Sequence, residues 1–271
     1  MDRLEKALQK AREEREAVTV RPNAVVEQLA LTETSKPAPS LPAPTSKKVV
    51  VSEKELENHR IVARASRSGN ADTFRILRTK ILRHFAETKQ TTLAVTSPNY
   101  GDGKTTVSVN LALSLALDVK QTVLLVDLDL RDPSIHHYLG IDPEVGLSDY
   151  FQHEVPVSQC LVNPGIDRLV VLPMGKPMEF SSEALGTPKM TALAKELKTR
   201  YPDRIVIYDM PPMLAQDDAI AFLPNVDAVL MVIKDGVTQI EDVRQCIHAL
   251  SGYNLIGTVL NNSSERTYSK E

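Results

Sequence analysis

The feature that most constrains the fold is a series of short apolar runs that alternate with amphipathic stretches from about residue 71 onward. Each run has the length of one strand and is apolar throughout, which is typical of strands buried on both faces of a parallel sheet. The alternation predicts right-handed βαβ crossovers and one doubly wound α/β domain with a mostly parallel sheet. We expect strands in TTLAVTS (91–97), TVLLVD (122–127), LVVLPM (169–174), RIVIYD (204–209), AVLMVI (228–233) and LIGTVL (255–260).

Helical patterns separate these runs. ADTFRILRTKILRHF (71–85) is amphipathic, and its spacing predicts an inward face of Phe74, Leu77, Ile81 and Leu82. Further helices are expected over 105–118, 187–200, 216–223 and 237–250, and residues 52–60 begin a helical or irregular approach segment. No internal repeat is present, so the pattern predicts one domain.

The N-terminal part has a different composition. Residues 1–17 predict a helix with a narrow apolar stripe of Leu4, Ala7, Leu8 and Ala11, which either docks on another protein or stays solvated. Residues 18–50 are rich in Pro, Ala and Ser and predict a flexible linker. We therefore divide the chain into residues 1–50, a domain over 51–265 and a mobile tail over 266–271.

Composition excludes several classes of function. The 271 residues carry a net charge of −3, which gives no reason to expect a nucleic-acid partner. Cys160 and Cys246 form neither a disulfide framework nor a metal motif, and we expect two buried, reduced thiols. No apolar run is long enough to span a bilayer, and the charged N-terminus does not match a signal peptide. We expect a cytoplasmic protein that reaches a membrane only through a partner.

The stretch SPNYGDGKTT (97–106) lies between an apolar strand and a helix, which is the context of a phosphate-binding P-loop. Gly101 and Gly103 permit backbone conformations that aim successive N–H groups at phosphate oxygens, and the start of the helix adds its positive end. Lys104 can reach the β- and γ-phosphates, and the Thr105 hydroxyl can bind Mg²⁺. Asp102 and Thr106 complete the expected nucleotide contacts.

Two strands end in carboxylates. Asp127 and Asp129 follow one apolar run, and Asp209 ends another, as in a Walker B sequence that holds Mg²⁺. The carboxyl ends of parallel strands form the ligand-binding edge of an α/β sheet. We expect the chain to leave the strand at this point, with both acids facing one site; taken alone, the pair would be interpreted as solvated loop acids. Together with the P-loop, these acids predict a nucleoside triphosphate site with Mg²⁺.

The motifs resemble the bacterial tyrosine kinases of polysaccharide export, of the CpsD/CapB type. The P-loop is similar to their S-x-x-P-G-E-G-K-[ST], with Tyr100 for the proline and Asp102 for the glutamate, and that pattern does not require a glycine at Pro98. Partition ATPases carry a lysine where this chain has Asn99, which counts against that group.

Other segments extend the resemblance over about residues 55–262. DLDLRDP matches the family's second carboxylate motif, D-x-D-x-R-x-P, and DMPP, SSEALGTPKM and GTVLNN match further segments. DTFRILRT is similar to the E-x-x-R-x-x-R helix, with Asp72 in place of glutamate beside Arg75 and Arg78. The resemblance implies ATP and Mg²⁺ as cofactors, Lys104, Asp127 and Asp129 as catalytic residues, and Thr105, Asp127 and Asp209 around the metal.

The resemblance also implies assembly and regulation. Asp72, Arg75 and Arg78 would join subunits into a ring. Without the resemblance, the same three residues would be interpreted as a solvated helix face. A separate membrane co-polymerase that sets polysaccharide chain length would be the activator, and Asn261 or Asn262 would contact adenine. Family tails carry a tyrosine cluster as the autophosphorylation substrate, whereas this tail has only Tyr268. The expected function is therefore an ATP-dependent tyrosine autokinase, with Asp127 as the preferred base; the alternative is a regulatory ATPase switch without significant tyrosine phosphorylation.

Overall fold

The computed structural model describes residue 51 and residues 53–63, 69–179, 181–201, 203–215 and 217–263. The predicted helix 1–17, the linker 18–50 and the tail 266–271 with Tyr268 lie outside the described residues. The domain boundaries therefore stay predictions, and the account below concerns the described residues alone.

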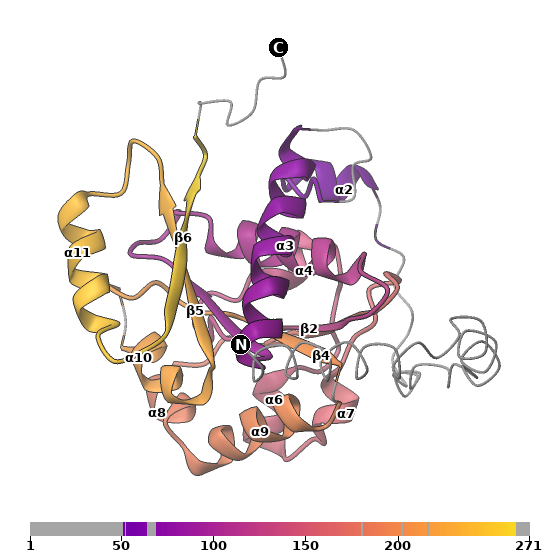
Figure 1. The fold of residues 1–271 in the computed structure, drawn as a ribbon. Helices are drawn as coiled ribbons and strands as arrows, with labels where there is room; N and C mark the ends of the chain where they lie inside the picture. The colour runs from indigo at the N-terminus through magenta and orange to yellow at the C-terminus, as the bar shows by residue number, and fades with distance from the viewer. Residues whose placement is uncertain are drawn as a thin grey trace, which may run out of the picture. The chain divides into compact units, whose positions relative to one another are not determined.

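Six parallel strands form one sheet with the order β3-β2-β4-β1-β5-β6 (Figure 1). The strands are β1 (Thr92–Thr96), β2 (Thr122–Asp127), β3 (Leu169–Leu172), β4 (Arg204–Asp209), β5 (Ala228–Lys234) and β6 (Leu255–Asn261). Each coincides with a predicted run, with β5 and β6 one residue longer than expected, so the parallel sheet is confirmed.

Helices connect the strands. They are α2 (Glu53–Asn58), α3 (Gly69–Thr88), α4 (Lys104–Ala116), α5 (Ile135–Tyr138), α6 (Leu147–His153), α7 (Val157–Cys160), α8 (Ser181–Leu185), α9 (Pro188–Thr199), α10 (Asp218–Phe222), the 3₁₀ turn η1 (Leu223–Asn225) and α11 (Ile240–Ala249). The short helices α5 to α8 were not predicted, because each offers two turns or fewer of periodic pattern. Helix α11 begins three residues later than expected, since residues 234–238 form a turn in which the Lys234 N–H donates to Thr238 Oγ1 at 2.9 Å.

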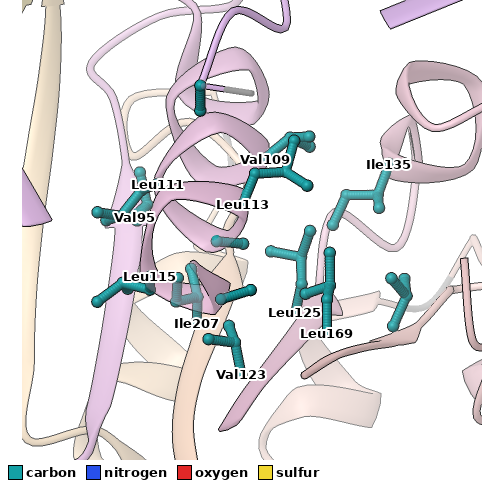
Figure 2. Close-up of a cluster of buried hydrophobic side chains, with 14 of the residues drawn as sticks. Val95, Val109, Leu111, Leu113, Leu115, Val123, Leu125, Ile135, Leu169 and Ile207 are labelled. Atoms are coloured by element: carbon teal, nitrogen blue, oxygen red, sulfur yellow. The ribbon is translucent and has the colours of Figure 1, made fainter. Parts of the chain in front are cut away.

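Helix α4 lies at the centre of one face of the sheet. All of its residues except Thr106 are buried, so it is a core helix covered on all sides. Its side chains Leu111, Leu113 and Leu115 belong to the same buried cluster as Leu125 of β2 and Ile207 of β4, which the close-up of the core shows (Figure 2). Because α4 begins at Lys104, this packing fixes the end of the P-loop relative to the sheet.

Helix α3 covers α4 on the outside. Ile81 is buried, and Phe74, Leu77 and Leu82 are half-buried against the core, which confirms the predicted inward face. The other face of the sheet receives α9 and α10: Tyr208 of β4 is fully buried, and its ring lies 4.8 Å from that of Phe222. Helices on both faces make the fold doubly wound, as predicted.

The thiols of Cys160 and Cys246 are free and buried, as expected. Among the described residues no helix is long and apolar enough to cross a membrane.

Candidate active site

The P-loop runs from Ser97 to Thr105 and joins β1 to α4. Gly101 has φ +78° and Gly103 has φ +96°, in the left-handed region that favours glycine. A Cβ on Gly103 would come within 2.0 Å of the side-chain nitrogen of Asn261, so any other residue there would displace that side chain. These two glycines therefore serve the loop conformation that the sequence predicted.

Asp102 holds the loop in shape. It is buried, and its two carboxylate oxygens accept hydrogen bonds from the Asn99 N–H (2.9 Å) and the Thr238 hydroxyl (2.8 Å). Asn99 in turn donates from its side-chain amide to Asp242 of α11 at 2.7 Å. Asp102 was predicted as a nucleotide contact, and the observed bonds join the P-loop to the segment between β5 and α11.

Lys104 forms an ion pair with Asp129. Its ammonium nitrogen lies 2.8 Å from Asp129 Oδ2, and both side chains are almost entirely buried. Burial disfavours the ammonium, but Asp209, Asp129 and Asp127 outweigh this effect and raise the pKa of Lys104. Lys104 is therefore charged at physiological pH.

Thr105 and Asp209 join α4 to the end of β4. The Thr105 hydroxyl donates to Asp209 Oδ2 at 2.6 Å, and Ser108, one turn further along α4, donates to Oδ1 at 2.8 Å. Ser134 approaches Thr105 from the other side, with 3.2 Å between the two hydroxyl oxygens. Ser108 and Ser134 were not predicted; the helical spacing of Ser108 from Thr105 is a signal that could have identified it.

Asp127 is the last residue of β2, and the chain leaves the strand after it, as expected. Its Oδ2 accepts the N–H groups of Ser134 and Ile135, each at 3.1 Å, at the start of α5. Its Oδ1 lies 3.3 Å from the Asp129 nitrogen, the donor of a third bond. This turn brings Asp127 and Asp129 to one site with Lys104, which sequence alternation alone could not show.

The three carboxylates share one cation. Burial and the charge of Asp209 raise the pKa of Asp127 to about 8, although the Ile135 N–H and Lys104 oppose the shift. Burial also raises the pKa of Asp209, against the effect of Lys104, Thr105 and Ser108. Since Lys104 supplies one positive charge against three carboxyl groups, the site favours a further cation.

The donor set fits Mg²⁺ bound with a phosphate ligand. Among the described residues no group of three His, Cys, Asp or Glu side chains forms a protein cage for a metal. Mg²⁺ in nucleotide sites needs only one or two protein ligands beside phosphate and water. The hydroxyl of Thr105 and the carboxylates of Asp127 and Asp209 could supply them.

The two asparagines at the end of β6, Asn261 and Asn262, have different surroundings. The Asn261 amide donates to the Asp102 carbonyl oxygen at 2.9 Å and so belongs to the P-loop support. Asn262 lies with Thr106 along a cavity beside the loop. The structure thus brings both predicted asparagines to the P-loop, where they line the cavity that Thr106 also borders.

The three residues of α3 that the sequence predicted at a subunit contact lie elsewhere. Arg75 pairs with Asp72 at 2.5 Å on the outer face of the helix; Asp72 is exposed and Arg75 is partly exposed. Arg78 points inward instead and donates to the Ser114 carbonyl oxygen near the end of α4, at 2.9 Å. The first two form a local surface pair, whereas Arg78 also ties α3 to α4.

Comparison with known proteins agrees with this geometry. The model of the AAA domain family matches residues 90–261. The chain is 31% identical over 209 residues to the tyrosine-protein kinase YwqD of Bacillus subtilis, covering 76% of this chain and 86% of that protein. It is 30% identical over 207 residues to the succinoglycan biosynthesis transport protein ExoP of Rhizobium meliloti; the match covers 74% of this chain but only 26% of ExoP.

A solved structure extends the comparison. The kinase domain of the Escherichia coli tyrosine kinase ETK superposes with a TM-score of 0.69 at 28% identity, covering 82% of this chain and 91% of that domain. The AAA domain match over residues 90–261 includes the P-loop and both carboxylate-bearing strand ends. The chain belongs to the bacterial tyrosine-protein kinases, on a parallel P-loop NTPase fold.

Proposed function

We propose that this kinase transfers the γ-phosphoryl group of ATP to protein tyrosine hydroxyls at the site formed by Lys104, Asp127, Asp129 and Asp209. The buried ion pair of Lys104 and Asp129 is the observation that carries the proposal. It holds a permanently charged ammonium at the mouth of a P-loop, where it can stabilise the negative charge of a transferring phosphoryl group.

Gly101, Asp102, Gly103 and Thr106 complete the phosphate-binding loop in this proposal. The two glycines expose backbone N–H groups, while Asp102 acts by holding the loop conformation. The start of α4 adds the positive end of a helix. These features position the phosphates, and phosphoryl transfer depends mostly on positioning and charge stabilisation.

Thr105, Asp127 and Asp209 would hold Mg²⁺, Asp209 through water. The metal supplies neutralisation of the phosphate charge and orients the phosphate oxygens. The hydrogen bonds from Thr105 and Ser108 to Asp209 keep both of its oxygens directed toward α4 before any ligand binds. This arrangement reduces the reorganisation that binding requires.

Asp127 is the preferred proton acceptor for the tyrosine hydroxyl. A general base is most effective when its pKa lies near the working pH, and burial raises the pKa of Asp127 toward that range. Asp129 is the second candidate for the proton acceptor, and its ion pair with Lys104 orients the ammonium group of that lysine. Comparing Asp127→Asn with Asp129→Asn in single-turnover transfer assigns the two roles: the loss of the base should remove the pH dependence of the rate.

We further propose a role in exopolysaccharide assembly. The similarity to ExoP, whose name describes succinoglycan transport, supports this role. A membrane co-polymerase that determines chain length would be the activator, and residues 1–50 would tether the kinase to it at the cytoplasmic side of the membrane. Deleting residues 1–50 should weaken co-purification with membranes and leave ATP binding unchanged; unchanged membrane association would place the contact on the domain.

The experiment that tests the activity is incubation of the purified chain with ATP and Mg²⁺, followed by mass spectrometry for phosphotyrosine. Wild type should be modified, and Lys104→Met should not be, since it lacks the cation that stabilises the transferring group. Phosphotyrosine on purified Lys104→Met would overturn the assignment of the site. ATP binding by wild type without any phosphotyrosine would favour the regulatory ATPase switch.

A further inference from the structure

A cavity of about 320 Å³ lies beside the P-loop. Gly103 and Thr106 line it from the loop and the first turn of α4, and Asn262 lines it from the end of β6. Its volume lies at the lower end of the range for small-molecule sites. The cavity therefore begins where a nucleotide bound by the P-loop would extend beyond its phosphates.

Further lining residues come from two segments outside the P-loop. His59 and Arg60 directly follow α2, and Tyr138 ends α5; all three line the cavity. The rings of His59 and Tyr138 lie 5.2 Å apart with an interplanar angle of 39°. None of these three residues belongs to the P-loop or to the carboxylate motifs, so nothing in the phosphate chemistry above requires them.

A buried asparagine fixes this segment to the P-loop helix. Asn110 of α4 accepts the N–H groups of Val62 and Ala63 at 2.8 and 3.0 Å. Its amide nitrogen donates to the carbonyl oxygens of Arg60 (3.1 Å) and Thr106 (2.8 Å). The hydrogen-bonding capacity of the amide is thus fully used. One side chain therefore sets the distance between residues 60–63 and α4.

Arg60 also reaches across the cavity. Its guanidinium Nη1 lies 3.4 Å from Asn262 Oδ1, and the two residues are 202 positions apart in sequence. Arg60 and Asn262 both have φ +58°, a left-handed conformation that is unfavourable for a long side chain such as arginine. Asparagine tolerates this conformation, so Arg60 is the unusual residue of the two, and its left-handed turn ends α2: the N–H groups of Arg60 and Ile61 donate to Glu57 and Leu56 at 2.9 and 2.8 Å.

We propose that His59, Arg60 and Tyr138 form a nucleoside clamp, which holds the base and ribose of the nucleotide whose phosphates lie on the P-loop. The proposal rests on the proposed function, in which ATP is the phosphoryl donor. The two rings supply flat apolar surface, and the guanidinium adds cation–π attraction to a purine face. Asn110 is the positioning residue, because it acts on the ligand only through the segment that it anchors.

The test measures ADP binding and inorganic tripolyphosphate binding to the full chain by isothermal titration calorimetry with Mg²⁺. His59→Ala removes one ring, and Arg60→Asn removes the guanidinium while keeping a residue that tolerates a left-handed backbone. Each should lower ADP affinity about tenfold, which is the scale for losing one stacking partner of a base. Tripolyphosphate affinity should not change, because that ligand has no nucleoside. Arg83→Ala, on the exposed face of α3, is the control and should bind both ligands like wild type.

Asn110→Asp tests the positioning role. It keeps the shape of the side chain but loses the two amide donors, and it should weaken ADP binding without weakening tripolyphosphate binding. The double variant Asn110→Asp with His59→Ala should lose little more ADP affinity than either single variant, since both changes act on the same side of the cavity. If the losses of ADP binding free energy in the two single variants simply add in the double variant, Asn110 has no positioning role. The variants His59→Ala and Arg60→Asn test the clamp even if Asn110→Asp does not fold.

The outcomes separate this proposal from the proposed function. Unchanged ADP affinity in both His59→Ala and Arg60→Asn would overturn the clamp while leaving nucleotide binding at the P-loop intact. Equal losses of ADP and tripolyphosphate binding would overturn it too, since the effect would then lie on the phosphates. If wild type bound neither ligand, the ATP site itself would be wrong.

Discussion

The hydroxyl of Thr105 donates a hydrogen bond of 2.6 Å to Oδ2 of Asp209, and this contact joins the first turn of α4 to the end of β4. The two residues are 104 positions apart, and one comes from the P-loop while the other ends the Walker B strand. The bond therefore joins the phosphate-binding and metal-binding halves of the candidate site.

Removing this hydroxyl should damage catalysis more than folding. Thr105→Ala should reduce the rate of tyrosine phosphorylation roughly 100-fold, the scale of losing one preorganised contact in a transition state. Thr105→Ser keeps the hydroxyl and should retain most of the activity. The rate measured across a Mg²⁺ titration checks both variants; a Thr105→Ala enzyme with the magnesium requirement and rate of wild type would contradict the proposed metal site.

The charged residues of α3 should separate into two effects. Asp72→Ala and Arg75→Ala remove an exposed i,i+3 pair worth only about 0.2–0.5 kcal/mol, so the free energy of unfolding should hardly change. If this pair lies in a subunit contact, both variants should lower the oligomer mass in light scattering. Arg78→Ala should additionally lower the free energy of unfolding by about 1.5–3 kcal/mol, because it removes a charged donor to Ser114.

An unchanged mass with Asp72→Ala and Arg75→Ala would favour a solvated helix face. The Arg78 variant cannot decide that question alone, since a smaller mass could follow from a weakened α3–α4 contact. Thermal unfolding of all three variants therefore accompanies the light scattering.

Tyr268 should carry most of the autophosphorylation. Tyr208 is fully buried against Phe222 and cannot reach a neighbouring active site, and Tyr253 is half-buried before β6. Phosphorylation of Tyr268 would add about −1.5 to −2 charges near a site that already contains three aspartates, and repulsion should favour release of the tail. Phosphopeptide mapping of wild type against Tyr268→Phe measures this; an undiminished total signal in the variant would place the substrate on another protein.

Asp227 predicts a pH dependence of stability. Its carboxylate accepts the N–H groups of Thr91 and Thr92 at 3.0 and 3.1 Å and pairs with Lys198. Burial alone would raise the pKa of Asp227, but these partners hold it below its ordinary value of 3.8. The stabilisation is therefore fully present above pH 3.8 and is lost as the pH falls through the lower pKa of the folded state.

The matching variant is Asp227→Asn. It should lower the free energy of unfolding at neutral pH by about 1 kcal/mol, since it loses a charge-assisted bond to Lys198. Its deficit relative to wild type should shrink in strong acid, where the wild-type carboxyl is protonated. Urea unfolding at both pH values checks this; a deficit independent of pH would contradict the role of the charge.

The sequence by itself determined the sheet. The six apolar runs each became a strand, because a strand buried on both faces needs an unbroken apolar stretch and helices must cross over between parallel strands. The sequence also determined the phosphate-binding loop that follows β1, because Gly103, Lys104 and Thr105 are consecutive and their arrangement depends on local backbone geometry. The short helices α5 to α8 were not predicted, because a helix of one or two turns is too short to show a hydrophobic period in the sequence.

Only the tertiary structure decided which distant residues meet. The pairing of Lys104 with Asp129 depends on how the chain leaves β2, and the bond of Ser108 to Asp209 depends on the register of α4 against β4. The inward direction of Arg78 and the anchoring of residues 60–63 by Asn110 likewise follow from helix packing. A local pattern fixes the conformation of a segment, but long-range contacts arise from burial of the whole core, which no single segment encodes.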